Sequence, residues 1–284
     1  MPRSFFPKKR GNLTNLPPTG KLSTEPRTFK DIVADLRHVV FSVIRDRPNA
    51  AGGVTSFPMG TGFFVAPKIF ITCDHVINPT ALPHLSGDSY RLIANLTGTS
   101  ATVHTLPSPQ IGNEILQFPN LDLAVLKVDS VPDDHPFAAL SYNEVQLGEE
   151  LGIVGYPLAS LTTDPNGDLR LEGLIYRTAK GSVSARYSGT LNPNAPDLPV
   201  VEVNFMFVTG NSGGPAFEAD TGRVIGMVQG ITWRGIAEEK VQTNIQQLPL
   251  GLSSIYIARI HAIYSLAIKL DCFRTALEGL GVSA

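Results

Sequence analysis

Residues 60–77 read GTGFFVAPKIFITCDHVI and hold two short apolar runs, Gly60–Val65 and Ile69–Thr72, joined by a proline-bearing turn. Runs of this length, rich in aromatic and β-branched residues and bounded by Gly and Pro, are typical of β-strands. The stretch therefore predicts a β-hairpin. Its second strand ends at His75, where a rigid strand end opens into a loop and a functional side chain is well placed.

The pattern of short apolar runs separated by turn residues continues beyond this hairpin, and the chain has 26 Gly and 22 Pro to form the turns. Two clusters of about six strands predict an all-β fold of two six-stranded antiparallel β-barrels, since closure removes exposed sheet edges. The further strands are expected at Tyr90–Leu96, Thr102–Leu106, Leu121–Val128, Glu150–Gly155, Leu169–Arg177, Lys180–Arg186, Val200–Phe205, Pro215–Glu218, Arg223–Gln229 and Ile255–Ile257.

Helical spacing of apolar residues occurs only near the two ends of the chain. It appears from Phe29 to Val43 and again at 260, 263, 266, 267 and 270, while residues 1–28 contain five prolines. We expect a flexible N-terminal arm at 1–28 and one folded unit at 29–270. Within it we place barrel one at about 39–130, a linker at 130–140, barrel two at about 141–257 and a C-terminal helix at about 258–270, followed by a tail at 271–284.

Composition excludes several classes of protein. Hydrophobic residues make up 43% and charged residues 17% of the 284, which excludes a disordered chain. A net charge of −2 provides no basic excess for nucleic-acid binding. No apolar run reaches the ~20 residues of a membrane span, and no apolar segment of a secretory signal follows the basic N-terminus, so a cytoplasmic location is expected. Cys73 and Cys272 lie far apart, which excludes a disulfide scaffold or a cysteine-based structural zinc site and favours free buried thiols.

A glycine-rich turn, GNSGGP at 210–215, holds a candidate nucleophile, Ser212. Glycines on both sides let the backbone turn sharply and let a substrate approach. The amides of Gly210 and Ser212 can then converge on one point, as an oxyanion hole requires. A surface Gly/Ser turn is the alternative, but the β-rich flanks favour a turn held between strands.

A serine nucleophile needs a base, and the base needs a partner that fixes its tautomer. Among six histidines, His75 stands at a strand exit, although such a residue is more often structural. Asp122 stands at the head of the apolar run LAVL, where a charge entering a core must be paired or hydrogen-bonded. A solvent-facing aspartate is the alternative. Asp74 is a poorer partner, because adjacent side chains of an extended segment point to opposite faces.

The segments ITCDHV, DLAVLKV and GNSGGP follow in the order His, Asp, Ser, with separations of 47 (122 − 75) and 90 (212 − 122) residues. The set resembles the chymotrypsin-like serine proteases, most closely the bacterial HtrA-like (DegP-like) trypsin-like peptidases. GTGFFV, LGEELGIVGYP, GSVSAR and RVIGMVQG support the resemblance, which covers roughly residues 39–270. Cys73 and Asp74 stand where the family has small residues. No PDZ domain is expected after Leu270, because 14 residues (284 − 270) remain.

The resemblance implies a serine endopeptidase that acts on polypeptides with no metal or cofactor. His75 would take the proton of Ser212, Asp122 would hold His75, and the amides of Gly210 and Ser212 would stabilise the oxyanion. The resemblance places the substrate pocket at Met206, Phe207 and Val208 on one wall and at Gln229 and Gly230 on the other.

None of the five pocket residues is acidic, so a Lys or Arg side chain would be buried unpaired there. Cleavage after small or medium apolar residues is therefore expected. The alternative is that 205–208 form a plain core strand. Two other functions stay open: a catalytically silent protein-binding module on the same fold, and an esterase. Gly210–Gly214 matches the Gly-x-Ser-x-Gly pattern, but an α/β-hydrolase has the order Ser, Asp, His and alternating helices.

Overall fold

The structure is a computed structural model that describes residues 27–97, 100–157, 160–163, 169–189, 197–205, 210–233 and 263–283. The first half of the chain forms a seven-stranded, barrel-like sheet in which all neighbouring strands are antiparallel. Its order is β5 (Ser100–Leu106), β4 (Ser89–Thr97), β1 (Val40–Pro48), β2 (Val54–Ala66), β3 (Ile69–Thr72), β7 (Leu123–Lys127) and β6 (Ile115–Phe118).

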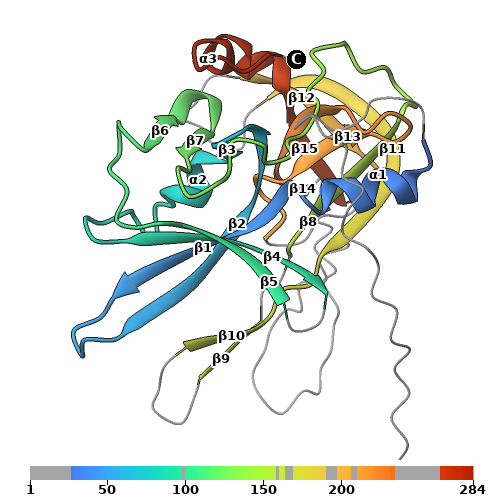
Figure 1. Cartoon of the computed structure of the whole chain (residues 1–284). Helices are drawn as coiled ribbons and strands as arrows, with labels where there is room; N and C mark the ends of the chain where they lie inside the picture. The colour runs from blue at the N-terminus through green and yellow to red at the C-terminus, as the bar shows by residue number, and fades with distance from the viewer. Residues whose placement is uncertain are drawn as a thin grey trace, which may run out of the picture.

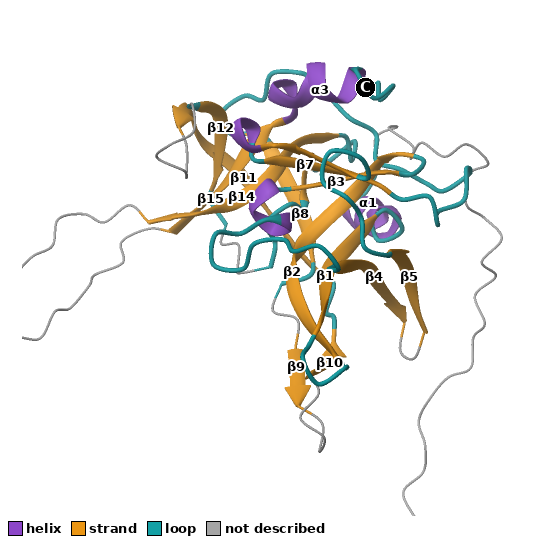
Figure 2. Ribbon diagram, turned by 90° about the vertical axis from the view of Figure 1, so that its left-hand side faces the viewer, coloured by secondary structure: helices purple, strands orange, loops and turns teal. Residues whose placement is uncertain are grey.

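The second half closes into a six-stranded antiparallel barrel, beside a separate hairpin of β9 (Ser160–Thr163) and β10 (Leu169–Gly173). The barrel order is β11 (Arg177–Gly189), β12 (Leu198–Val203), β15 (Ile263–Lys269), β14 (Val224–Trp233), β13 (Pro215–Glu218) and β8 (Glu150–Gly155). The all-β fold class is confirmed, with seven strands rather than six in the first sheet. Figures 1 and 2 show the β9–β10 hairpin at the opposite end of the molecule from the C-terminus.

Helix α1 (Phe29–Leu36) precedes barrel one in sequence but packs on barrel two, beside β8 and β13 (Figure 1). Thr28 caps it by accepting the Asp31 amide at 3.3 Å, which satisfies one free N–H of the first turn. Ile32 and Leu36 are buried, and the Phe29 ring stacks on Phe217 of β13 with centroids 5.8 Å apart. The described chain thus begins with a segment anchored on barrel two.

The segment between β7 and β8 connects the barrels through backbone hydrogen bonds. The Ala138 amide donates to Phe64 of β2 at 2.9 Å, and the Val224 amide of β14 donates to Ala139 at 2.8 Å. Consecutive residues therefore bond to opposite barrels. A large apolar core lies within the first sheet and between the barrels, and a smaller core fills the closed barrel.

The C-terminal helix lies further along the chain than expected. Instead of a helix at 258–270, residues 263–269 form β15, and the turn η2 (Leu270–Phe273) leads into α3 (Arg274–Glu278). Ala267 packs inside barrel two, while Ile268 packs in the larger core, so both faces of β15 are buried. A strand buried on both faces lacks the alternation of apolar and polar residues, and its apolar spacing therefore resembles that of a helix. The expected tail also packs, with Phe273 and Leu277 fully buried.

The expected strand at Ile255–Ile257 and residues 1–26 of the expected arm lie outside the described residues. In the described parts of the chain, no helix has the length and apolar character needed to cross a membrane.

Candidate active site

His75 is carried by α2 (Asp74–Ile77), a single helical turn that follows β3. Val76 and Ile77 are buried and anchor the turn, while the His75 side chain is 44% exposed. The buried guanidinium of Arg45 donates to the Ile77 carbonyl at 2.5 Å and fixes the end of the turn. The imidazole is therefore a reachable group on a rigid support.

Asp122 meets His75 from the turn before β7. It has a left-handed backbone, φ 48°, after the 3-10 turn η1 (Pro119–Leu121), a conformation that aspartate tolerates better than most residues. His75 Nδ1 lies 2.8 Å from Oδ2 and 3.0 Å from Oδ1, and the His75 amide also donates to Oδ1 at 3.0 Å. Residues 47 positions apart thus form a paired imidazole and carboxylate.

Hydrogen bonds keep the Asp122 carboxyl ionised. Burial alone would raise its pKa, but hydrogen bonds from His75 and Gln229, together with the charge of His75, hold the pKa below its usual value. The neighbouring Asp74 differs. Burial raises the pKa of Asp74, and the hydrogen bond from Gln117 Nε2, 2.7 Å from Oδ1, opposes that rise without cancelling it. Asp74 thus bonds to Gln117, and Asp122 is the carboxylate that meets His75.

The Ser212 turn needs its glycines. Gly210 and Gly213 have φ values of 100° and 86°, which L side chains rarely adopt. A Cβ on Gly213 would lie 2.1 Å from the Thr61 carbonyl oxygen and 3.1 Å from the Cys73 amide nitrogen. The residue after Ser212 is therefore pressed against the strand that leads to His75.

Gly60 shows how closely the Ser212 loop approaches α2. A Cβ on Gly60 would meet Val76 at 2.7 Å on one side and the Ser212 carbonyl oxygen at 2.9 Å on the other. The structure thus brings the neighbour of His75 and the backbone of Ser212 to the same glycine of β2.

Gln229 contacts both Ser212 and Asp122. The Ser212 hydroxyl donates to the Gln229 carbonyl at 3.1 Å, and Gln229 Nε2 donates to Asp122 Oδ2 at 3.1 Å. A register shift between Val228 and Gly230 in β14 marks a bulge at this residue, which re-aims its side chain. Within the described ranges, no hydrogen bond joins Ser212 to His75. The Ser212 hydroxyl thus bonds to the Gln229 carbonyl in this structure.

The backbone amides of the Ser212 turn differ in their hydrogen bonds to the described residues. Among hydrogen bonds between described residues, neither the Gly210 nor the Ser212 amide is a donor, whereas the Gly213 and Gly214 amides bond to Val228 and Asn211. Free N–H groups beside a serine hydroxyl can stabilise a negative oxygen. The assignment of the Gly210 and Ser212 amides to an oxyanion hole stays a prediction.

Thr61, in the GTG of β2, makes polar contacts that the sequence analysis missed. Its hydroxyl donates to the Gly210 carbonyl at 2.6 Å and accepts the Tyr156 amide at 3.0 Å, and its own amide donates to the Ser212 carbonyl at 2.9 Å. It is fully buried. The sequence did offer one sign of such a role, since Thr61 is a polar residue between two glycines in an otherwise apolar strand.

The expected substrate pocket is only partly described. Met206, Phe207 and Val208 lie outside the described residues, and Gly230 is half-buried on β14. Gln229, expected on a pocket wall, is 6% exposed, and its side-chain amide bonds to Asp122. Its place on the pocket wall stays a prediction.

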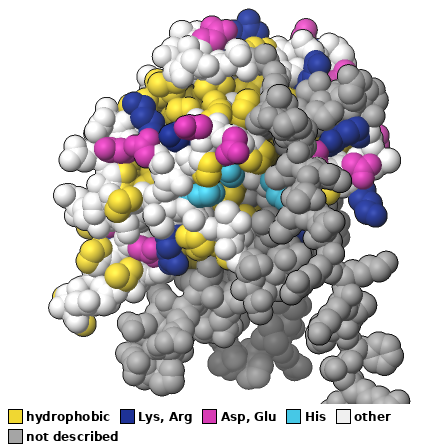
Figure 3. Space-filling view, viewed as in Figure 1, with side chains coloured by type: hydrophobic (Ala, Val, Ile, Leu, Met, Phe, Trp, Pro, Cys, Tyr) yellow, Lys and Arg dark blue, Asp and Glu magenta, His cyan; other side chains and the backbone are white. Residues whose placement is uncertain are grey.

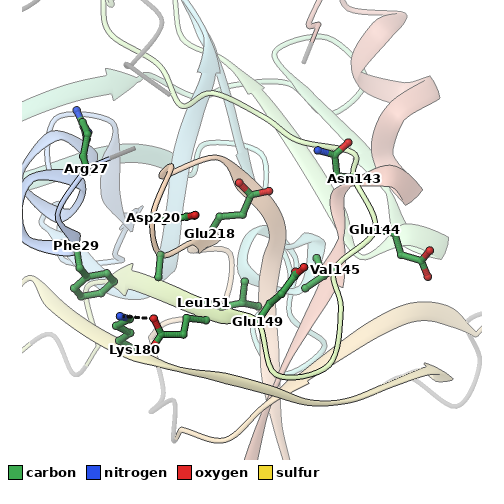
Figure 4. Close-up of a pocket in the computed structure, with 12 residues that line it drawn as sticks. Arg27, Phe29, Asn143, Glu144, Val145, Glu149, Leu151, Lys180, Glu218 and Asp220 are labelled. Atoms are coloured by element: carbon green, nitrogen blue, oxygen red, sulfur yellow. Dashed lines mark ion pairs between the residues drawn. The ribbon is translucent and has the colours of Figure 1, made fainter. Parts of the chain in front are cut away.

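A cavity of about 620 Å³ lies elsewhere, along α1, β8 and β13 (Figure 4). Five of its twelve lining residues are acidic, and His75, Asp122 and Ser212 are not among the twelve, so we assign the cavity no part in the chemistry. The acidic residues that line it are Glu144, Glu149, Glu150, Glu218 and Asp220.

Cys73 lies beside the His75–Asp122 pair and is fully buried. Its thiol donates to the Val228 carbonyl at 3.3 Å. Burial, and then the charge of Asp122, raise the pKa of this thiol well above its usual value. The ligand atoms of Cys73, His75 and Asp122 all lie within 4.8 Å of one another. Figure 3 shows histidine side chains at the surface with acidic side chains beside them.

Residues 60–227, more than half of the chain, match the family described as the trypsin-like peptidase domain. The chain belongs to the trypsin-like peptidases. Two curated relatives, both named probable periplasmic serine endoprotease DegP-like, support this. The relative from Pseudomonas savastanoi is 31% identical over 60% of this chain and 28% of its own length. The relative from Pseudomonas fulva is 26% identical over 65% of this chain and 32% of its own length. This trypsin-like peptidase thus spans about a third of the length of these relatives.

Solved structures agree on the fold. The active form of the Rv3671c protease from M. tuberculosis matches with a TM-score of 0.54 and 17% identity, over 98% of this chain and 96% of that one. The HtrA-type protease AlgW with tripeptide matches with a TM-score of 0.52 and 16% identity, over 89% of this chain and 64% of that one. At these identities the likeness concerns the fold alone.

The expectation of a cytoplasmic location is wrong on this comparison. The four curated relatives are all named periplasmic endoproteases. A basic N-terminus without an apolar segment after it was therefore insufficient ground for placing this trypsin-like peptidase in the cytoplasm.

Proposed function

We propose that this trypsin-like peptidase is a serine endopeptidase in which Ser212 is the nucleophile, His75 the general base and Asp122 the residue that orients His75. The observation that carries the proposal is the His75–Asp122 pair at 2.8 Å beside a glycine-rich turn that holds Ser212. A carboxylate at Nδ1 keeps the proton on that nitrogen and leaves Nε2 free to accept one.

The reaction would proceed by acyl transfer. His75 accepts the Ser212 proton as the hydroxyl attacks the peptide carbonyl, then returns it to the leaving amine, and water releases the acyl group. The amides of Gly210 and Ser212 stabilise the tetrahedral oxyanion, and one such donor contributes about 2.7–4 kcal/mol in the transition state. A catalytically silent binding module is the competing function. It is the weaker candidate, because it would not need the half-buried Asp122 carboxylate to be paired with His75.

A fluorophosphonate probe tests the assignment, because it reacts with an activated serine and not with an ordinary one. The purified chain should be labelled, and Ser212→Ala should not. Ser184→Ala is the control, because Ser184 is a serine of β11 whose hydroxyl bonds to the Glu202 carbonyl. Labelling of Ser212→Ala at the rate of the unaltered chain would exclude Ser212. A chain that is folded but unlabelled would favour the binding module.

The substrate preference is the less direct part of the proposal. Of the five residues expected around the pocket, none carries a carboxylate that could pair with a Lys or Arg side chain. Cleavage after small or medium apolar residues such as Val, Ala, Leu or Ile follows, because these gain ~25 cal/mol per Å² buried. A peptide-library profile dominated by Arg or Lys at the cleaved position would overturn the preference and leave the nucleophile standing.

A further inference from the structure

We propose that Cys73, His75 and Asp122 form an inhibitory zinc site, in which the ion occupies the space between the thiol, Nδ1 and the carboxylate. Its effect on activity rests on the proposed function of His75, whereas its binding does not. In the part of the chain that the structure describes, this is the cluster of three potential ligand side chains with atoms close enough to share an ion.

The spacing fits zinc after small movements. A Zn²⁺ ion binds nitrogen and oxygen at about 2.0–2.2 Å and sulfur at about 2.3 Å in a tetrahedral arrangement. Ligand atoms of such an ion therefore lie roughly 3.3–3.6 Å apart. The three atoms here lie within 4.8 Å of one another, and Nδ1 lies 2.8 Å from Oδ2. The thiol has to approach by up to about 1.2 Å and the His–Asp pair has to open by about half an ångström.

The three groups also supply suitable chemistry and access. Thiolate, imidazole and carboxylate are the usual zinc ligands, and a site with three protein ligands leaves a fourth position for water. Cys73 is fully buried, whereas the His75 side chain is 44% exposed, so the ion enters from the imidazole side. Gln229 already donates to Asp122 Oδ2, which is the outer hydrogen bond that ligating carboxylates commonly have.

Binding would change the protons of the site in a defined way. The ion replaces the thiol proton, which leaves to solvent, and forms the Zn–S bond. Nδ1, which faces Asp122 in the free enzyme, gives its lone pair to zinc, so the imidazole proton moves to Nε2. An Nε2–H imidazole cannot accept the Ser212 proton. Zinc therefore holds His75 in the tautomer that is inactive in general-base catalysis.

The test combines inhibition with a direct spectroscopic reading of the thiolate. Each protein is titrated with Zn²⁺ in a peptidase assay, relative to its own metal-free rate, and then treated with a chelator. Cys73→Ser and Cys73→Ala are compared with Cys272→Ala, which removes the other free thiol. We expect reversible inhibition of the unaltered chain and of Cys272→Ala, and at least about tenfold weaker inhibition of both Cys73 variants.

Cobalt substitution separates the metal site from the catalytic assignment. Co²⁺ should give near-ultraviolet sulfur-to-metal charge-transfer absorption in the unaltered chain and in Cys272→Ala, and none in Cys73→Ser. This reading stands even for a preparation without peptidase activity. Absence of the band in the unaltered chain, or equal zinc inhibition of folded Cys73 variants and the unaltered chain, overturns the proposal.

Discussion

At the scale of single residues, Asp122 organises the site. Its two carboxylate oxygens accept the His75 amide, His75 Nδ1 and Gln229 Nε2, and its backbone carbonyl accepts the Asp74 amide at 3.1 Å. The three bonds to the carboxylate oxygens favour its ionised form, and the backbone bond holds the Asp122 turn against α2. In the proposed mechanism Asp122 therefore fixes the position and the tautomer of the imidazole.

Replacing this carboxylate by an amide should slow catalysis with little effect on substrate binding. In Asp122→Asn the amide no longer stabilises an Nδ1 proton, so kcat should fall by up to about 10⁴-fold while KM changes little. Steady-state kinetics on protein normalised by fluorophosphonate titration measures this. Asp74→Asn is the matched control and should cost less than tenfold, because Asp74 bonds to Gln117 instead. Equal losses in the two variants would argue that Asp122 has no special role.

Some of these residues could be read from the sequence and others could not. His75, Asp122 and Ser212 each stand at the end of an apolar strand or in a glycine-rich turn, so their local sequence marks them. The contact of Gln229 with Asp122 depends on a bulge in β14 and on a residue 107 positions away, which no local pattern encodes. The sequence predicts Gln229 on the pocket wall, and the structure adds its hydrogen bond to Asp122.

At the scale of elements, strand prediction worked for short apolar runs bounded by turn residues, such as β3 and β7. It failed at β15, where Ala267 and Ile268 are buried on opposite faces and alternation disappears. The short turn α2 was also read as the end of a strand, because four residues cannot show a helical period. Strands β1 to β7 confirm the first barrel-like unit, while the closure of the second barrel is visible only in the pairing of β11 with both β8 and β12.

The segment between the barrels contains a pH-sensitive contact. His135 stacks edge-on against Phe64, with centroids 4.5 Å apart, and against His104 of β5 at 5.2 Å. The Nε2 atoms of both histidines are buried without a hydrogen-bond partner among the described residues. Burial, and then the charge of His104, lower the pKa of His135 to about 4, with Asp134 opposing and His38 adding to the shift.

We therefore expect the free energy of unfolding to fall as pH falls from 6.5 towards 4. In that window the unfolded chain binds protons that folded His135 excludes, so acid favours unfolding. In His135→Phe the loss of stability between pH 7 and pH 5 should shrink by about 1 kcal/mol, a figure discounted for the partial exposure of His135. Urea unfolding at the two pH values measures it. His104→Phe should act in the same direction, and an unchanged pH dependence in both variants would contradict the expectation.

At the scale of the whole molecule, the proposed site draws its residues from two units, the seven-stranded sheet and the closed barrel. His75 and Asp122 come from the first sheet, and Ser212 and Gln229 come from the barrel. The segment at Ala138 and Ala139 bonds to both units. Thr61 adds a buried polar link from β2 to both Gly210 and Tyr156. The two units are thus joined both through the connecting segment and at the Ser212 turn.

Removing the Thr61 hydroxyl should therefore misplace the Ser212 turn. In Thr61→Val the Gly210 carbonyl and the Tyr156 amide lose their partner, which should cost about 1–3 kcal/mol of stability. A displacement of the turn well below 1 Å should lower kcat by roughly 10–100-fold with KM nearly unchanged. Thr61→Ser keeps the hydroxyl and should recover most of kcat. Thr178→Val removes a hydroxyl that bonds to a β8 carbonyl at 2.9 Å, and should leave kcat unaltered. If Thr61→Val loses stability but keeps kcat, Thr61 serves the fold and not the geometry of the oxyanion turn.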